Sequence, residues 1–233
     1  MTIAEQITRA KADLDAVFEA GKKAEWSVLW DSLQDKGART SYNYFFHTWA
    51  DDIFYPKYDL ICVGNANAMF ASNKIVDFKG RLQECGVTFD TSGATSVQEL
   101  FAYAQLLTRV PVISTVSAPN AVYLFTNDYA LVEVEKVILK ADGSQIFTST
   151  FNRCENLVSI TFEGVIGQNI NFQWSTKLSK ASITNIMEHL STTASGMTAS
   201  FSQTAIVNAF GSTDNADWVA LKNSRSNWTI ALA

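Results

Sequence analysis

The 233-residue sequence has few of the residues that build compact chemical sites, with three cysteines and two histidines. Cys62, Cys85 and Cys154 are widely spaced and odd in number, which argues against a disulfide framework and a structural zinc site. We therefore expect three reduced, buried thiols. His47 and His189 are far apart, so no HxH or HxxxH ligand pair exists. The sequence predicts no metal and no cofactor.

The chain also lacks a basic stripe and a long apolar run. Its 18 Lys and Arg residues are scattered among 23 Asp and Glu, for a net charge of -5, so nucleic acid is not an expected partner. No stretch approaches the roughly 20 apolar residues that span a bilayer, and we expect no membrane insertion. The opening MTIAEQITRAKADLD mixes charged and apolar residues, unlike a secretory signal peptide. We expect a protein made in the cytoplasm without export through a signal peptide.

Residues 1–35 are predicted to form a helical segment. Apolar or small residues alternate at spacings of four and three, at Ile3, Ile7, Ala10, Leu14, Val17, Gly21 and Ala24. This spacing marks one seam of a helix. The seam suits either self-association or docking on the rest of the chain. If the helix self-associates, Ile at one seam position with Leu at the other favours a coiled coil of more than two helices. We therefore expect a homo-oligomer, with a trimer as the first choice.

The segment 36–66 is predicted to be an aromatic-rich, irregular cap. Aromatic side chains are dense from the end of the helix onward, at Trp26, Trp30, Tyr42, Tyr44, Phe45, Phe46, Trp49, Phe54 and Tyr55. A repeat protein needs such a cap because its first repeat would otherwise expose its core to water. An aromatic platform for a ligand is the alternative interpretation.

One apolar pattern recurs along residues 67–178. From Phe151, apolar or small residues follow at offsets of three, six, nine and eleven: Cys154, Leu157, Ile160 and Phe162. Related patterns begin at Phe70, where the copy is shortened, and at Phe101, Phe125 and Phe172. Asp128 and Lys136 depart from the pattern, since a small and an apolar residue are expected there. The first residues of successive copies are separated by 31, 24, 26 and 21 residues. These spacings centre on the length of one leucine-rich repeat.

The fold class expected from this spacing is an α/β repeat. It would be a short irregular leucine-rich-repeat solenoid whose parallel strands include Val110 to Ile113, Val134 to Leu139 and Ser159 to Phe162. Residues 179–233 would form a helical C-terminal cap, with helices through Ile183–Leu190 and Trp218–Leu221 and a last strand in WTIALA. A globular α/β domain with accidental spacing is the alternative.

The run FNRCENLVSITFEGVIGQNINF resembles a repeat of the BspA-type leucine-rich-repeat family. The N-terminal MTIAEQITRAKADLDAVFEAGKKAEW and the tail MEHLSTTASGMTASFSQTAIVNAFGST with SNWTIAL are similar to proteins encoded in phage or prophage tail regions of gut Firmicutes. The resemblance is weak between Thr40 and Thr95. It implies a tail-associated virion protein, assembled in the bacterial cytoplasm and released by lysis. A location in the bacterial cytoplasm or on the cell surface is the alternative.

Motifs for enzyme chemistry are absent from the sequence, which contains no GxSxG elbow and no glycine-rich phosphate loop. Glu133 and Glu135 alternate on a predicted strand and, with Asp128, could suggest a polysaccharide hydrolase, although such pairs more often form a solvated face. His47 lies near Asp51 and Asp52, where structural packing is favoured over metal binding. His189 is expected at the end of a helix, where the dipole favours a cation.

The sequence therefore predicts a non-enzymatic binding or structural protein whose partner is a protein or glycan of a host surface. The candidate binding surface consists of polar and aromatic residues interleaved with the core: Tyr123, Asn127, Tyr129, Arg153, Gln168, Asn171, Gln173 and Trp174. The alternatives are an architectural component that binds other virion proteins, a bacterial surface adhesin, and a polysaccharide hydrolase.

Overall fold

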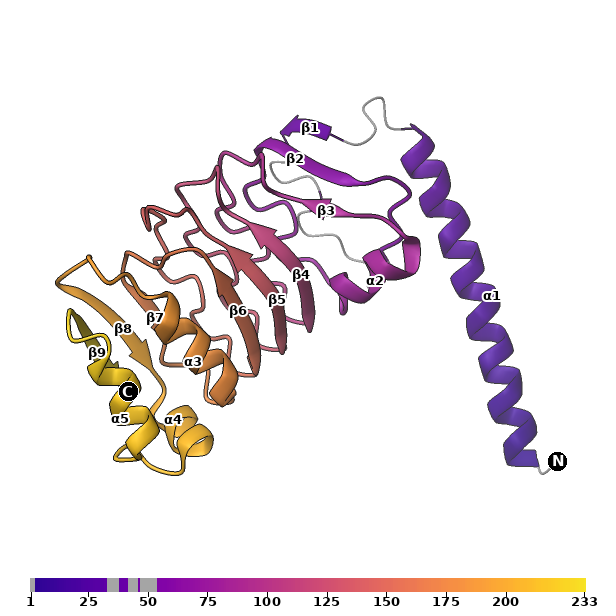
Figure 1. Cartoon of the computed structure of the whole chain (residues 1–233). Coiled ribbons are helices and arrows are strands. Elements are labelled where there is room, and N and C mark those ends of the chain that lie inside the picture. The colour runs from indigo at the N-terminus through magenta and orange to yellow at the C-terminus, as the bar shows by residue number, and fades with distance from the viewer. Residues whose placement is uncertain (1–2, 33–37, 42–45, 47–53) are drawn as a thin grey trace.

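The computed structural model describes residues 3–32, 38–41, 46 and 54–233 of an α/β protein (Figure 1). A long N-terminal helix precedes a body of small parallel sheets, and further helices lie near the C-terminus. The elements follow one another as α1 (Ile3–Ser32), β1 (Ala38–Ser41), β2 (Leu60–Asn65), α2 (Phe78–Cys85), β3 (Phe89–Asp90), β4 (Arg109–Ser114), β5 (Glu133–Ile138), β6 (Ser159–Glu163), β7 (Ile170–Phe172), α3 (Lys180–His189), β8 (Met197–Phe201), α4 (Gln203–Phe210), α5 (Ala216–Asn223) and β9 (Trp228–Leu232).

The strands form three parallel sheets of three strands each, in the orders β1-β2-β3, β4-β5-β6 and β7-β8-β9. The strands expected near Val110, Val134 and Ser159 are confirmed as β4, β5 and β6, and the strand expected in WTIALA is β9. The helices expected around Ile183 and Trp218 are confirmed as α3 and α5. Strands β2 and β8 and helices α2 and α4 were not predicted from the sequence.

A column of buried phenylalanine rings runs through the body. Consecutive rings lie 4.5 to 6.1 Å apart between centroids and are tilted from one another by 27° or less. The column consists of Phe46, Phe70, Phe101, Phe125, Phe151, Phe172 and Phe201. Five of these rings are the predicted origins of the apolar pattern. Phe46 and Phe201 extend the column at both ends, into segments that the sequence assigned to caps.

Backbone hydrogen bonds join the first four phenylalanines of the column to the next turn of the chain. The amide of Phe70 donates to Leu100 O (2.8 Å), and the amide of Phe101 donates to Leu124 O (3.0 Å). The residues two before and two after four of these phenylalanines have positive φ: Ala68 and Ser72, Glu99 and Tyr103, Tyr123 and Asn127, Ser149 and Arg153. A left-handed residue other than glycine costs about 1–2 kcal/mol. Each paired kink turns the chain so that the intervening phenylalanine faces inward.

A β-bulge explains why Lys136 departs from the apolar pattern. In the β5-β6 pair, Val134 lies opposite Ile160 while Val137 lies opposite Phe162, so β5 contains one extra residue. Val137 is therefore buried in the place predicted for Lys136, and the Lys136 ammonium binds the Glu163 carboxylate at 2.8 Å. Ile113 lies opposite Val137, so Ile113 and not Val112 is the second fully buried apolar residue of β4, after Val110.

Helix α3 covers the edge of β6. The amide of Ile160 donates to Ser182 Oγ (3.0 Å), and the amide of Phe162 donates to Asn185 Oδ1 (2.6 Å). These side chains satisfy the backbone groups that would otherwise form an open sheet edge. The offset of nine residues from Phe172 falls on Ala181, but Ala181 is exposed because it lies in α3, whose buried residues follow helical spacing.

Asp128 occupies a buried position, three residues after Phe125, where the pattern predicts a small residue. Its Oδ1 atom accepts a hydrogen bond from the amide of Ala104 in the previous turn (2.8 Å). Oδ2 has no hydrogen-bond partner among the residues that the structure describes. Desolvation raises the pKa of Asp128 well above its usual value, although the bond from Ala104 opposes the shift. The carboxyl group is therefore stabilised in its protonated form.

The cysteines partly match the expectation of buried thiols. Cys62 and Cys154 are buried, whereas Cys85 is half-buried at the end of α2, and all three are free. Burial raises the pKa of Cys62 to about 12 and also raises the pKa of Cys154. Among the described residues, no helix combines the length and apolar character that a membrane span requires.

We predict that Phe125→Ala lowers the free energy of unfolding by about 3–5 kcal/mol, because it removes a ring that is stacked at 5.8 Å on both Phe101 and Phe151. Urea titration followed by circular dichroism measures the change. Leu106→Ala is the control, since this side chain is 48% exposed and its loss should cost less than about 1 kcal/mol. Equal losses in the two variants would contradict a central role for the column.

We also predict that Asp128→Asn stabilises the protein increasingly as pH rises. At pH values below the unfolded pKa, near 3.8, both states of the wild type are protonated at Asp128. Above that value the unfolded chain releases its proton while the folded chain retains it, so wild-type stability falls by up to about 1.4 kcal/mol per pH unit until the folded pKa is reached. The asparagine amide has no such proton. Urea titrations from pH 4 upward test this, and a pH-independent difference would contradict it.

Candidate binding surface

Four of the predicted surface residues form a connected cluster on the outside of the body. The Arg153 guanidinium donates from Nη1 to the Tyr129 hydroxyl at 3.1 Å, and that hydroxyl lies 3.3 Å from Asn127 Oδ1. The guanidinium also lies 5.9 Å from the centre of the Trp174 ring. We call Asn127, Tyr129, Arg153 and Trp174 the aromatic-cationic cluster.

The repeat itself places three members of this cluster. Asn127, Arg153 and Trp174 each follow a phenylalanine of the column by two residues. Asn127 and Arg153 have positive φ, with values of 62° and 58°. Because the phenylalanines are stacked, the side chains two positions later lie on successive turns along one surface. Tyr103 holds the same position one turn earlier and is 49% exposed.

Asn156 and Lys177 extend the aromatic-cationic cluster. Asn156 Nδ2 donates to Tyr129 O at 2.6 Å, and Lys177 Nζ donates to Asn156 Oδ1 at 2.5 Å. Neither residue, nor Tyr103, was among the sequence candidates. Tyr103 follows its column phenylalanine by two residues, as Asn127 and Arg153 do. Asn156 and Lys177 each follow theirs by five residues. Comparing equivalent positions between turns would have found all three.

The side chains of the cluster combine charge with apolar area. Trp174 is 42% exposed, so part of its ring is available to a ligand. The hydrogen bond to Tyr129 raises the pKa of Arg153, which keeps the guanidinium cationic. Trp, Tyr and Arg are the residues that most often dominate binding energy at interfaces. The arrangement can stack a flat apolar group and bind an oxygen-rich or anionic group beside it.

The other four predicted residues lie outside this cluster. Tyr123 is 38% exposed and precedes Phe125 by two residues. Asn171 Oδ1 accepts a hydrogen bond from the amide of Gln173 at 2.8 Å, and Asn171 also lines a shallow pocket of about 320 Å³ with Asn169, Ile170, Thr198 and neighbouring residues. Gln168 is half-buried in the segment before β7. The structure thus connects half of the predicted surface and leaves the rest dispersed.

The carboxylates considered for hydrolysis do not form a common site. Glu133 and Glu135 both bind the ammonium of Lys79, at 2.5 and 3.2 Å. The hydrogen bond that Lys79 donates to Glu133 is the largest of the contacts that raise the pKa of Lys79. Asp128 is fully buried and bound to the backbone of the previous turn. Asp128 therefore does not join the two glutamates at the surface, as the polysaccharide-hydrolase alternative would require.

Of the two histidines, the structure describes His189 and not His47. His189 is the last residue of α3, and its Nδ1 atom lies 2.7 Å from Gly164 O, so its helix-end position is confirmed. His47, Asp51 and Asp52 lie outside the described residues. Among the residues that are described, no three His, Cys, Asp or Glu side chains come together as metal ligands would.

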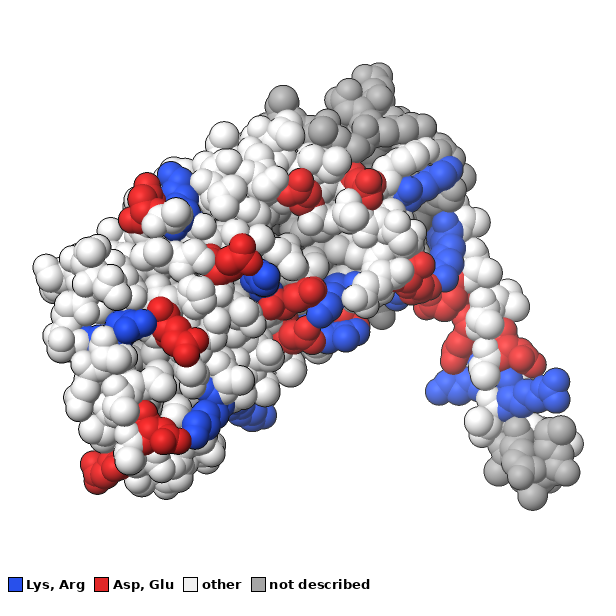
Figure 2. All heavy atoms as spheres, viewed as in Figure 1, with Lys and Arg blue, Asp and Glu red and all other residues white. Residues whose placement is uncertain are grey.

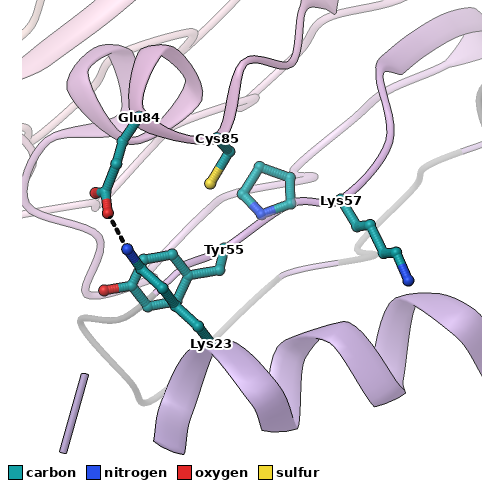
Figure 3. A pocket seen from close by; sticks show the side chains of 6 residues that line it. Lys23, Tyr55, Lys57, Glu84 and Cys85 are labelled. Carbon is teal, nitrogen blue, oxygen red and sulfur yellow. Dashed lines mark hydrogen bonds and ion pairs between the residues drawn. The ribbon is translucent and has the colours of Figure 1, made fainter. Parts of the chain in front are cut away.

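A pocket of about 290 Å³ lies between α1 and the body (Figure 3). Lys23 and Glu84 point toward each other across it and form an ion pair. The Lys23 ammonium and the Arg81 guanidinium lie 4.8 and 4.2 Å from the centre of the Tyr55 ring. The hydrogen bond from Lys23 lowers the pKa of Glu84. The contacts of Lys23 with Glu84 and Tyr55 attach α1 to the body, and we call these two contacts the α1 attachment.

Acidic and basic side chains are interspersed over the molecular surface. Figure 2 shows blue and red residues beside one another on the face in view. Ion pairs at the surface include Lys136 with Glu163 and Lys180 with Asp217. On this face the charge pattern does not form the single-sign stripe typical of a nucleic-acid interface.

Comparisons of the chain with protein-family models, with curated proteins and with solved structures found no match.

Proposed function

We propose that the body is a short, irregular leucine-rich-repeat solenoid of the BspA-like kind. The stacked phenylalanines, the repeated left-handed pairs and the parallel β4-β5-β6 sheet support this interpretation. Backbone hydrogen bonds join each turn to its neighbour, which is the nearest-neighbour dependence of repeat proteins. The repeat is irregular because successive phenylalanines of the column are separated by 21 to 31 residues.

We propose further that the protein is a non-enzymatic binding module for a surface polysaccharide of a host bacterium. The observation that carries this proposal is the aromatic-cationic cluster on successive turns. Trp174 can stack on the apolar face of a sugar ring, while Arg153 and Asn127 can bind hydroxyl or acidic groups at its rim. Neighbouring strand-like turns are about 4.8 Å apart, so the two steps from Tyr129 to Trp174 span about 10 Å, the scale of a disaccharide.

The biological setting proposed is the tail of a phage. The resemblance to tail-region proteins supports it, as does a long helix that can attach a binding body to an assembly. In this setting other virion proteins are partners as well. The alternative is an architectural tail component that binds virion proteins alone. Such a component would show no saturable binding to bacterial envelopes.

We predict that Trp174→Ala and Arg153→Ala each weaken binding to isolated cell walls at least tenfold, because each removes one of the two contact types in the cluster. The measurement is saturable sedimentation of labelled protein with cell walls from a panel of gut Firmicutes. Loss of one well-packed hot-spot side chain costs about 1.4 kcal/mol or more, which corresponds to that factor.

Val219→Ala is the matched control. Val219 is 38% exposed and lies on α5, which contains no residue of the cluster. Its binding should equal that of the wild type. Protease treatment of the walls should leave binding intact, and chemical removal of wall polysaccharide should abolish it. Binding that survives both substitutions, or wild-type protein that binds no wall preparation, overturns the polysaccharide proposal.

A further inference from the structure

Helix α1 presents an apolar stripe that no part of the described body covers. Leu14, Val17 and Phe18 are 69%, 70% and 57% exposed. Ala10, Gly21 and Ala24 on the same seam are exposed as well. Figure 1 shows α1 extending away from the sheets, with its N-terminal end far from the body. Apolar side chains in this spacing are ordinarily buried against another helix.

The α1 attachment leaves this stripe uncovered because it uses the opposite side of the helix. An α-helix turns about 100° per residue, so Lys23, nine residues after Leu14, lies about 180° around the axis from it. Lys23 contacts Glu84 and Tyr55 of the body. The body is thus fixed to one side of α1 while Leu14 and Val17 face outward on the other.

The width of the stripe favours a bundle of more than two helices. At about 100° per residue, the apolar stripe from Ala24 to Phe18, which includes the seam, covers roughly 120° of the helix circumference. A two-stranded coiled coil buries a narrower stripe, whereas a helix in a larger bundle buries 100° or more. Phe18, which lies beside the seam, adds the apolar area that a second neighbouring helix would cover.

The charges beside the seam suit parallel, in-register copies. In that arrangement, the residues that directly precede Ile7, Leu14 and Gly21 each meet the residue five further along the next helix. These pairs are Gln6 with Lys11, Asp13 with Phe18, and Ala20 with Glu25. None brings like charges together. The Lys22 ammonium lies 5.7 Å from the centre of the Phe18 ring, so the Asp13 carboxylate of a neighbour would approach a cation there.

We propose that three copies of this chain associate through α1 as a parallel, in-register bundle, with the three bodies on its outside. The seam at Leu14 and Val17 forms the axis of the bundle. The α1 attachment keeps each body clear of that axis. This interaction does not depend on the polysaccharide-binding cluster, which lies on the body, so either proposal can fail without the other.

The first experiment measures the mass of the full chain by light scattering after gel filtration at micromolar concentration. We expect the wild type to have three times the chain mass of 25.7 kDa. The double variant Leu14→Glu and Val17→Glu should fall threefold to a single chain, because it places charges in the seam. Ala12→Glu, on the opposite face, is the matched control and should keep the wild-type mass. A single-chain or two-chain wild type, or an unchanged double variant, overturns the proposal.

The second experiment tests the direction of the helices by oxidative crosslinking. Ala10→Cys lies on the seam, so parallel in-register copies bring its thiols together, whereas Ala12→Cys faces away from the axis. We expect chain-to-chain disulfides in Ala10→Cys at least tenfold above those in Ala12→Cys and in the wild type with its own three cysteines. Equal crosslinking in the two variants overturns the parallel, in-register arrangement.

Discussion

Stacking of phenylalanine rings is the interaction on which the rest of the body depends. In each of four turns the chain adopts two left-handed residues around one phenylalanine, at a cost of about 2–4 kcal/mol per turn. Burial of the ring contributes about 1.5–3 kcal/mol, and a well-placed aromatic neighbour adds about 0.5–1.5 kcal/mol. The opposing contributions are similar in size, so a kinked turn is stable only when its ring has neighbours. No turn of this chain is therefore expected to fold independently of the others.

The same constraint determines which side chains can act together at the surface. The column fixes the position of each phenylalanine and so the position of the residue two further along, which is left-handed at Asn127 and Arg153. Asn127, Arg153 and Trp174 become neighbours in space although 26 and 21 residues separate them in sequence. Binding residues thus arise from equivalent positions in successive turns, and their spacing follows the spacing of the core. Substitution of a core ring would consequently disturb the surface cluster as well as stability.

Spacing predicted the centre of the fold because the buried residues there are large and regular. Phe101, Phe125 and Phe151 are separated by similar intervals, and β4, β5 and β6 follow each of them at the expected distance. The pattern was less informative where backbone irregularity changed the register. The bulge in β5 brings Val137 inward in place of Lys136, and a one-residue shift of this kind leaves no clear sequence signal.

The candidate surface was harder to predict than the core, since exposure restricts residue type only weakly. Alternation identified Arg153 and Trp174 but also selected Gln168, which the cluster does not include. Asp128 shows the converse difficulty. Its charge suggested a surface or catalytic role, yet its carboxyl group satisfies the amide of Ala104 inside the body. A carboxyl group can replace a small core residue when a backbone N–H donates a hydrogen bond to it. The sequence alone does not show which backbone N–H will lie beside the carboxyl group.

The two ends of the phenylalanine column differ in the elements that contact them. At the C-terminal side, α3 supplies Ser182 and Asn185 to the free edge of β6, and the ring column continues to Phe201 against Trp218. At the N-terminal side, Lys23 of α1 contacts the body through an ion pair and a cation-aromatic contact, and the seam residues from Ala10 to Ala24, whose burial the structure describes, are exposed. A helix that only capped the column would direct Leu14 and Val17 inward. Their outward orientation leaves this stretch of α1 available for assembly.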